Sequence, residues 1–119
     1  MNVIFTPEAG EALAELHHYI EVAASKTVAK RYVGEVVKFC ESLGRFAPER
    51  GIRRDDLRPG LRITNYKGRV VIAFAVESDQ LAIIGVLDAR FGVAYAHRKS
   101  IAARLFLATH SHYYFSFMP

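Results

Sequence analysis

The sequence predicts a small α+β domain in which an N-terminal strand and an antiparallel pair of helices precede an antiparallel sheet of three to four strands. Apolar residues recur at helical spacing between residues 9 and 43. Two dense strand patterns, at 70–76 and 81–87, are joined by a short acidic turn. A length of 119 residues corresponds to one domain.

The strand and the helices come first along the chain. Residues 2–5 are short and apolar enough for a strand, and Thr6-Pro7-Glu8 supplies the hydroxyl cap, early proline and acid of a helix start. This helix is expected to end near Ala24. A second cap at 25–27 begins a helix that runs to Gly44, a candidate C′ residue. Because few residues separate the helices, they are expected to pack antiparallel.

The sheet is predicted from the middle of the chain onward. Residues 47–60 are polar and punctuated by Pro and Gly, which predicts a basic loop. Three strands are then expected, at 61–66, 69–76 and 80–87. The last two are continuous apolar runs, typical of strands at the centre of a sheet with both faces covered. The helical pair can cover one of those faces.

The C-terminal tail is expected to be an extra segment. Residues 96–109 have a helical apolar spacing, and residues 110–119 are aromatic without any Lys, Arg, Asp or Glu. Exposed aromatic surface of this kind is a liability, so the tail is expected to pack or to form an interface. The expected division is a domain over 1–95 and an extension of open status over 96–119.

Composition limits the cellular context. The sequence has no 18-residue apolar run and no signal-peptide pattern, so a cytoplasmic protein without a membrane partner is expected. The single Cys40 agrees, because one cysteine forms no internal disulfide. Its helical context favours a buried apolar side chain over a nucleophile.

The positive charge is concentrated in the second half of the chain. Residues 1–44 carry six acids against four Lys or Arg, whereas residues 45–69 carry eight Lys or Arg against three acids. After Asp88 there is no acid at all. Such a surface suits a polyanion, either nucleic acid or an acidic protein segment, although a merely solvated basic face has the same charge.

No motif for a metal or a cofactor is present, and neither group is expected. His17 and His18 project about 100° apart on a helix and cannot readily share one ion. His110 and His112 have no Cys, Asp or Glu nearby to complete a site. Gly-rich phosphate loops, CxxC, HExxH and GxSxG are all missing from the sequence.

Three motifs carry a resemblance to a known family. They are P-G-L-R at 59–62, V-V-I-A-F-A-V at 70–76 and I-I-G-V-L-x-x-R at 83–90. Their order and spacing over residues 2–92 resemble the RelE/ParE superfamily of bacterial toxins, most closely the ParE branch. The chain departs from that branch at residues 88–89, Asp-Ala for His-Gly, and at residues 91–92, Phe-Gly for Arg-Asp.

The ParE resemblance implies the toxin of a type II toxin–antitoxin module (a plasmid-stabilisation system) that inhibits DNA gyrase by binding. Toxins of this branch are not enzymes. A small antitoxin neutralises them, and an acidic, amphipathic antitoxin segment would fit this chain; a homodimer or a toxin–antitoxin hetero-oligomer is compatible with this assignment. The target-binding candidates are Arg62, Arg69, Arg90 and Phe91. The antitoxin-binding candidates, for which a core role is also open, are Leu13, Leu16, Ile20, Tyr32 and Val36.

Two alternatives remain open at the level of sequence. A RelE-like protein would be a metal-independent, ribosome-dependent mRNA endoribonuclease. Arg62, Arg69 and Arg90 would then clamp phosphate, with Tyr95 or His97 as the acid or base. Arginine is a good phosphate ligand but a poor base, because its pKa lies above about 12. The other alternative is an inactive toxin homologue that persists as an interaction module.

Overall fold

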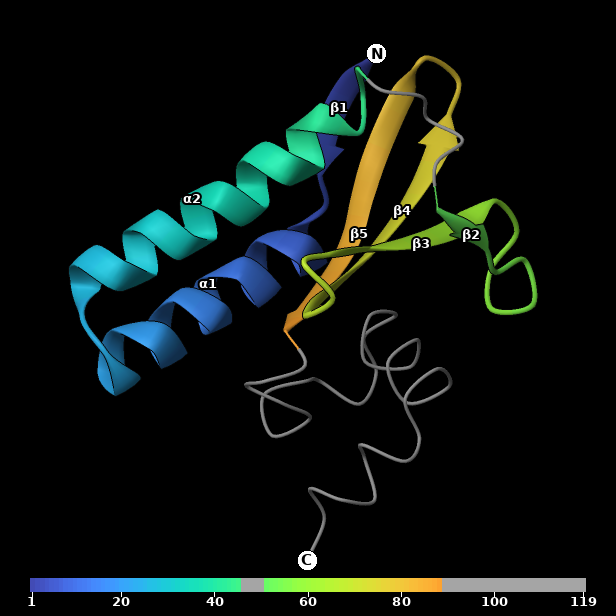
Figure 1. Cartoon of the computed structure of the whole chain (residues 1–119). Coiled ribbons are helices and arrows are strands. Elements are labelled where there is room, and N and C mark those ends of the chain that lie inside the picture. The colour runs from blue at the N-terminus through green and yellow to red at the C-terminus, as the bar shows by residue number, and fades with distance from the viewer. Residues whose placement is uncertain (46–50, 89–119) are drawn as a thin grey trace, which may run out of the picture.

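The computed structural model describes residues 1–45 and 51–88. Two helices and five strands follow one another in these ranges (Figure 1). Their bounds are β1 (Asn2–Phe5), α1 (Pro7–Ala23), α2 (Lys26–Ser42), β2 (Ile52–Arg53), β3 (Leu61–Tyr66), β4 (Val70–Glu77) and β5 (Gln80–Asp88). The α+β class, the N-terminal strand and the helical hairpin are therefore confirmed. Neither helix in these ranges is long and apolar enough to cross a membrane.

Within the described residues, the sheet has five strands in the order β1-β5-β4-β3-β2. The antiparallel ladder formed by β3, β4 and β5 was predicted, but β1 also joins the sheet, parallel to β5. The second addition is β2, which pairs with β3 inside the segment predicted to be a loop. Sequence patterning missed β2 because the strand is only two residues long and both residues are exposed.

Both helices begin where the capping residues predict. The Thr6 hydroxyl accepts a hydrogen bond from the Ala9 amide at 3.2 Å and donates one to the Ile83 carbonyl at 3.0 Å. Thr6 therefore caps α1 and ties it to β5. The Ser25 hydroxyl caps α2 by accepting from the Val28 amide at 3.1 Å.

The glycine that follows α2 has a different role from the one predicted. Gly44 is not among the described glycines with positive φ, so it is not the left-handed C′ residue expected from the sequence. It is buried against β1 instead. A Cβ atom at this position would lie 2.6 Å from the Met1 carbonyl oxygen and 2.7 Å from Val3 Cγ2. Close packing, rather than the turn, therefore requires a glycine here.

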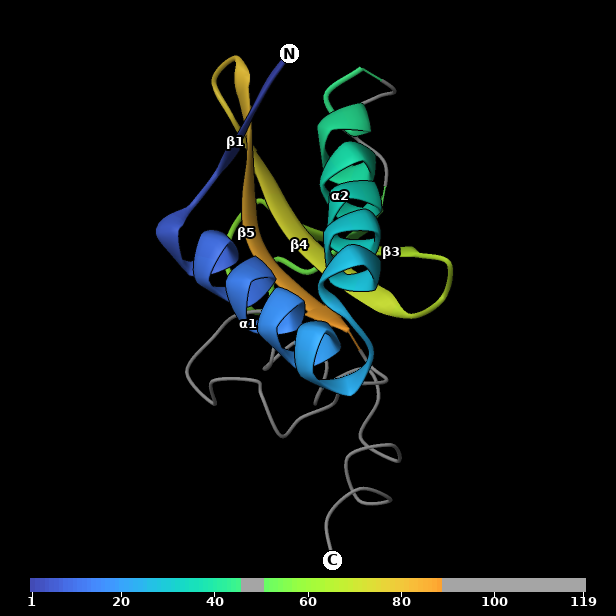
Figure 2. The same cartoon turned by 90° about the vertical axis from the view of Figure 1, so that its left-hand side faces the viewer.

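The two helices lie side by side on one face of the sheet (Figure 2). The main core fills the space between the helical hairpin and the sheet. Its fully buried members come from the hairpin (Ala9, Val36, Cys40, Leu43) and from the two central strands (Val70, Ile72, Phe74, Leu81, Ile83). Because side chains alternate along a strand, Ala73 and Ala75 point to the opposite face, where they cluster with Leu61 and Ile84.

An irregularity in the β4–β5 ladder sets which β5 residues reach the helices. Ala73 pairs with Gly85, but Phe74 pairs with Ile83, so Ile84 is an extra residue in β5. The bulge shifts the alternation by one position. Leu81 and Ile83 on one side of it and Val86 on the other consequently join the same core.

Candidate functional site

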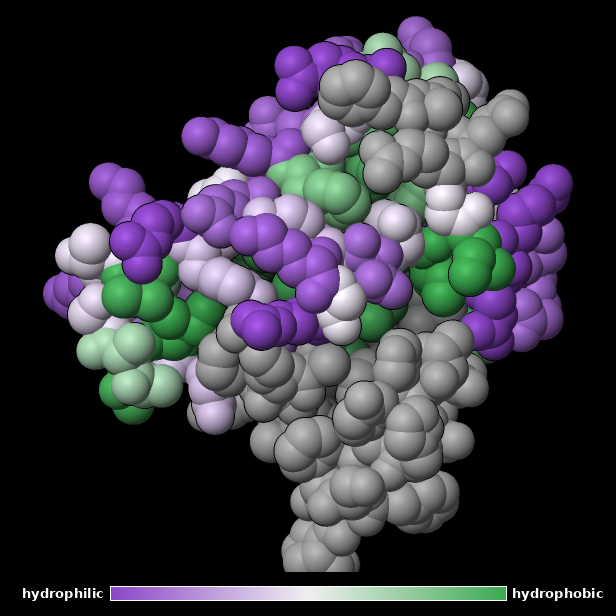
Figure 3. All heavy atoms as spheres, in the orientation of Figure 1, coloured by the Kyte–Doolittle hydropathy of each residue, from purple (hydrophilic) through white to green (hydrophobic). Residues whose placement is uncertain are grey.

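A pocket lies between α2 and the turn that joins β3 to β4. Its volume is about 270 Å³. One face of α2 supplies Val28, Arg31, Tyr32 and Glu35, which lie within two turns of that helix, and the turn supplies Lys67 and Arg69. Hydrophilic side chains gather over this region of the molecule (Figure 3).

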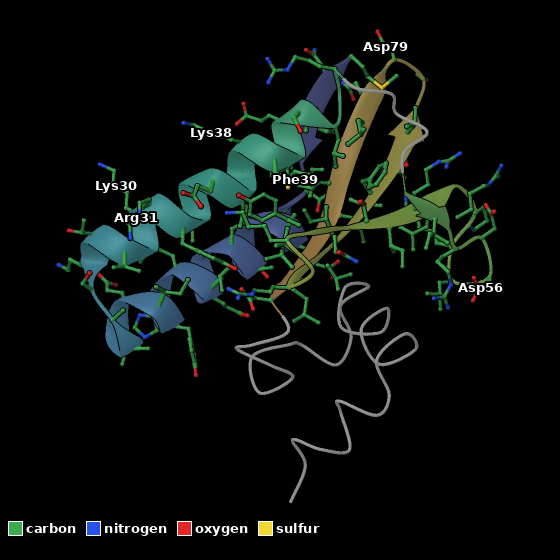
Figure 4. The ribbon with its side chains drawn as sticks, viewed as in Figure 1. Lys30, Arg31, Lys38, Phe39, Asp56 and Asp79 are labelled. Carbon is green, nitrogen blue, oxygen red and sulfur yellow. The ribbon has the colours of Figure 1, made fainter. Side chains whose placement is uncertain are left out.

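The turn that forms one wall of the pocket has a defined geometry. Lys67 and Gly68 both have positive φ, 54° and 69°, and the Arg69 amide donates to the Tyr66 carbonyl at 3.1 Å. Two central residues with positive φ are typical of a type I′ hairpin turn. The Lys67 ammonium lies 5.3 Å from the centre of the Tyr66 ring, and that ring packs on Phe39 of α2 with centroids 4.9 Å apart. Figure 4 shows Phe39 directed from α2 toward the sheet.

The pocket carries an excess of positive charge. Arg31, Lys67 and Arg69 stand against a single carboxylate, that of Glu35. Within residues 1–45 and 51–88, none of the three cations forms an ion pair. An anion entering the pocket would therefore find cationic partners without having to break an existing salt bridge.

Tyr32 connects α2, the other wall of the pocket, to the end of β5. Its hydroxyl donates a hydrogen bond to Asp88 Oδ2 at 2.5 Å, and Asp88 is only 4% exposed. A buried carboxylate needs hydrogen-bond donors, since desolvation without them is costly. The hydrogen bond thus restrains Tyr32, which is one of the lining residues of the pocket.

The loop before β3 is charged but largely neutralised. Arg53 pairs with Asp55 at 3.0 Å, Arg54 with Asp56 at 2.9 Å, and Arg58 with Glu77 at 3.2 Å. In the described part of the predicted basic loop, residues 51–60, these three arginines are therefore each paired with an acid.

Asp55 organises this loop. Its carboxylate accepts from the Gly60 amide at 2.9 Å as well as from Arg53. The Gly60 amide first, then the Arg53 side chain, and to a smaller extent the nearby Arg62, hold the pKa of Asp55 below its ordinary value. Arg54 lowers the pKa of Asp56 in the same way.

Comparison with known proteins identifies the family. The family model of the ParE toxin of the type II toxin–antitoxin system, parDE, matches residues 3–91. The chain belongs to the ParE toxin family. No curated protein matches the chain. Among solved structures, the chain is similar to one described as the chromosomal ParDE TA system from P. aeruginosa, with a TM-score of 0.64 and 19% identity, over 74% of this chain and 95% of that one. At that identity the likeness shows the fold, which matches the α+β fold inferred from the sequence.

The arginines predicted to bind the target are divided between two places in this ParE fold. Arg69 lines the pocket, whereas Arg62 lies on β3 opposite Phe74 and beside Arg53 of β2. The part of β3 from Arg62 to Tyr66 spans about 13 Å, so the two arginines start from opposite ends of this strand. Arg90, Phe91, Tyr95 and His97 lie outside the described residues.

The candidates for antitoxin binding are mostly core residues. Leu16, Ile20 and Val36 are at most 7% exposed, and the first two pack with Ala29 between the helices. Leu13 and Tyr32 are half-buried against the core. A partner laid on the hairpin could touch only the edges of these side chains, and of the five only Tyr32 lines the pocket.

Other reactive groups in the described ranges lie apart from the pocket. His17 and His18 are on α1, and no group of three or more His, Cys, Asp or Glu residues in these ranges could hold a metal ion. Cys40 is fully buried, and burial raises the pKa of its thiol to about 12. A buried, protonated thiol is a core residue rather than a nucleophile.

Sequence reasoning missed Arg31 as a site residue. On the sequence it is one of several charged positions on a helix, a pattern that also describes a solvated face. The available signal was its position directly before Tyr32, together with the pair Lys67 and Arg69 in a turn. Only the tertiary structure brings these two segments together.

Proposed function

We propose that this ParE-family toxin acts by binding DNA gyrase and that a cognate antitoxin neutralises it by binding the toxin directly. Membership of the ParE toxin family over residues 3–91 carries the proposal. The fold shared with a ParDE toxin–antitoxin system supports it.

The two described arginines among the predicted target-binding residues suit the binding of anions. Arg62 and Arg69 are good ligands for phosphate or carboxylate groups, because guanidinium can bind these anions bidentately. A general base must lie within hydrogen-bond reach of the proton that it removes. Both described histidines lie on α1, whereas the two arginines lie on β3 and the following turn.

The deciding experiment is a gyrase assay with the purified, folded chain. Gyrase inhibition predicts loss of supercoiling together with accumulation of cleaved plasmid, because a poison traps the enzyme on cut DNA. Unchanged supercoiling and no cleaved plasmid would contradict the proposal. Ribosome-dependent cleavage of mRNA under the same conditions would replace it with the RelE-like alternative.

Single-residue variants connect the assay to the proposed target-binding residues. Arg90→Ala should relieve growth arrest in cells without lowering the free energy of unfolding. Arg62→Ala and Arg69→Ala should each raise the concentration for half-inhibition of gyrase by about fivefold, the equivalent of one charged contact of about 1 kcal/mol. Lys38→Ala is the control: Lys38 is exposed on α2 and, like Lys30, projects away from the sheet (Figure 4). Full toxicity of a well-expressed Arg90→Ala variant would remove Arg90 from the site.

A further inference from the structure

The pocket between α2 and the β3–β4 turn has the features of a receptor for a particular kind of side chain. Its six lining residues come from two segments that are distant in the sequence but rigid in the fold. Tyr32 is held by Asp88, and the turn is held by its hydrogen bond and by the packing of Tyr66 on Phe39. The walls therefore exist before any ligand arrives, which lowers the entropic cost of binding.

The charge of the lining selects an anion. Arg31, Lys67 and Arg69 form no ion pair with any residue of the described ranges, in contrast to the arginines of the loop at 53–58. The carboxylate of Glu35 reduces the positive charge without cancelling it. The pocket therefore brings together three cations without an ion pair among the described residues, whereas Arg53, Arg54 and Arg58 each have an acidic partner.

The apolar part of the lining favours a peptide side chain over a nucleic-acid backbone. The pocket has a volume of about 270 Å³. Val28 and the Tyr32 ring add apolar surface next to the cations. Glu35 weakens the attraction of the pocket for any anion, but it can accept a hydrogen bond from a peptide amide or a basic neighbour, and a phosphodiester group has no such donor.

We propose that this pocket binds a side-chain carboxylate of the antitoxin, carried next to an apolar residue on an acidic, amphipathic segment. The apolar neighbour would pack on Val28 and Tyr32 while Arg31, Lys67 and Arg69 bind the carboxylate. The proposal rests on antitoxin binding in the proposed function, but it does not depend on the identity of the toxin's target.

The first test uses small probes on the full-length chain. Backbone amide shifts are followed by NMR during titration with N-acetyl-Leu-Glu-amide, N-acetyl-Leu-Gln-amide or inorganic phosphate. The glutamate probe should shift amides of residues 28–35 and 66–69, whereas the glutamine probe should bind at least about fivefold more weakly. Tighter binding of phosphate than of the glutamate probe would make this a phosphate site and overturn the proposal. The proposal is also overturned if none of the probes shifts these amides.

Matched variants show whether the pocket is responsible. Arg31→Glu with Lys67→Glu should weaken binding of the glutamate probe about tenfold or more, because two attractions become repulsions. Lys30→Glu with Lys38→Glu makes the same change of charge at two exposed positions of α2 outside the pocket, and should have less than about a twofold effect. Equal loss in both variants would indicate general electrostatics and would contradict the pocket.

The Glu35→Gln variant distinguishes carboxylate binding by the pocket from a catalytic role of Glu35. Removing the carboxylate should tighten binding of the glutamate probe about two- to fivefold, a gain that unfolding cannot produce. If Glu35 were instead the base of an RNA-cleaving site, the same variant would abolish ribosome-dependent cleavage. That loss would contradict the proposal.

The final arm uses the antitoxin itself, purified with the tagged chain. Arg31→Glu with Lys67→Glu should raise its Kd about tenfold or more, and Lys30→Glu with Lys38→Glu should leave it within about twofold. Unchanged affinity of the double variant would overturn the assignment to the antitoxin. Neither titration involves gyrase or growth arrest, so a negative gyrase assay and a negative pocket test remain distinguishable.

Discussion

A hydrogen bond from Tyr32 to Asp88 joins α2 to the end of β5, and we expect it to stabilise the fold. Tyr32→Phe removes the donor to Asp88 but keeps the ring. We expect the free energy of unfolding to fall by about 1–2 kcal/mol, because a buried carboxylate loses a hydrogen bond. Tyr66→Phe is the control, since the Tyr66 hydroxyl has no hydrogen bond within the described ranges. Urea denaturation measures both; equal stability of Tyr32→Phe and wild type would show that the bond contributes nothing.

Because of Cys40, the stability of the folded core should depend on pH in the alkaline range. Burial raises the pKa of the Cys40 thiol from the ordinary value near 8.5 to about 12, so the folded state binds this proton more tightly than the unfolded state. Its contribution to stability is therefore complete below about pH 8.5 and is lost as the pH rises toward 12.

Two measurements check the assignment of Cys40. Native protein at pH 8 should resist thiol reagents, whereas the unfolded chain should react at once, because the thiol is buried and almost entirely protonated. Between about pH 8.5 and 10.5 the free energy of unfolding should also fall more steeply in wild type than in Cys40→Ala. Rapid labelling of the native protein would show that Cys40 is accessible.

At the scale of the elements, alanine substitutions at two glycines should change the stability of the protein in opposite directions. Gly34 lies inside α2, and Gly44 follows its end. No atom lies within 4 Å of the position that an added methyl group at Gly34 would occupy, so Gly34→Ala should stabilise the protein by about 0.5–1 kcal/mol. Gly44→Ala should destabilise it by about 1–3 kcal/mol, since the new methyl meets Met1 and Val3 at under 3 Å. Thermal unfolding measures both changes, and a neutral Gly44→Ala would mean that β1 can move away at little cost.

At the scale of the whole molecule, stability should be graded across the sheet. The residues of β4 and β5 are almost entirely buried, whereas both residues of β2 are exposed. Amides that open only when the whole domain unfolds exchange most slowly. Native-state hydrogen exchange should therefore show the slowest amides in β4 and β5 and faster exchange in β2 and the loop at 54–60. Equal protection of β2 and β5 would show that the loop folds as one unit with the core.

Elements whose signals are local could be predicted from the amino-acid sequence. Thr6 and Ser25 mark the two helix starts, and the apolar runs at 70–76 and 81–87 mark the central strands. Capping and side-chain periodicity depend on residues within a few positions of one another, so they can be inferred without knowing the fold. The three ParE-like motifs extended this prediction to the family, which the match over residues 3–91 confirms.

The way in which distant segments meet became known only from the folded chain. The parallel pairing of β1 with β5 and the close approach of Gly44 to Val3 each join residues far apart in the chain, and the bulge at Ile84 depends on how β4 and β5 pair. The same applies to charge: the loop arginines are paired, whereas Arg31, Lys67 and Arg69 line one pocket. Composition reports how many charges a chain has, but the energy of a charge depends on its distance to others and on its burial. Those two quantities exist only once the chain has folded.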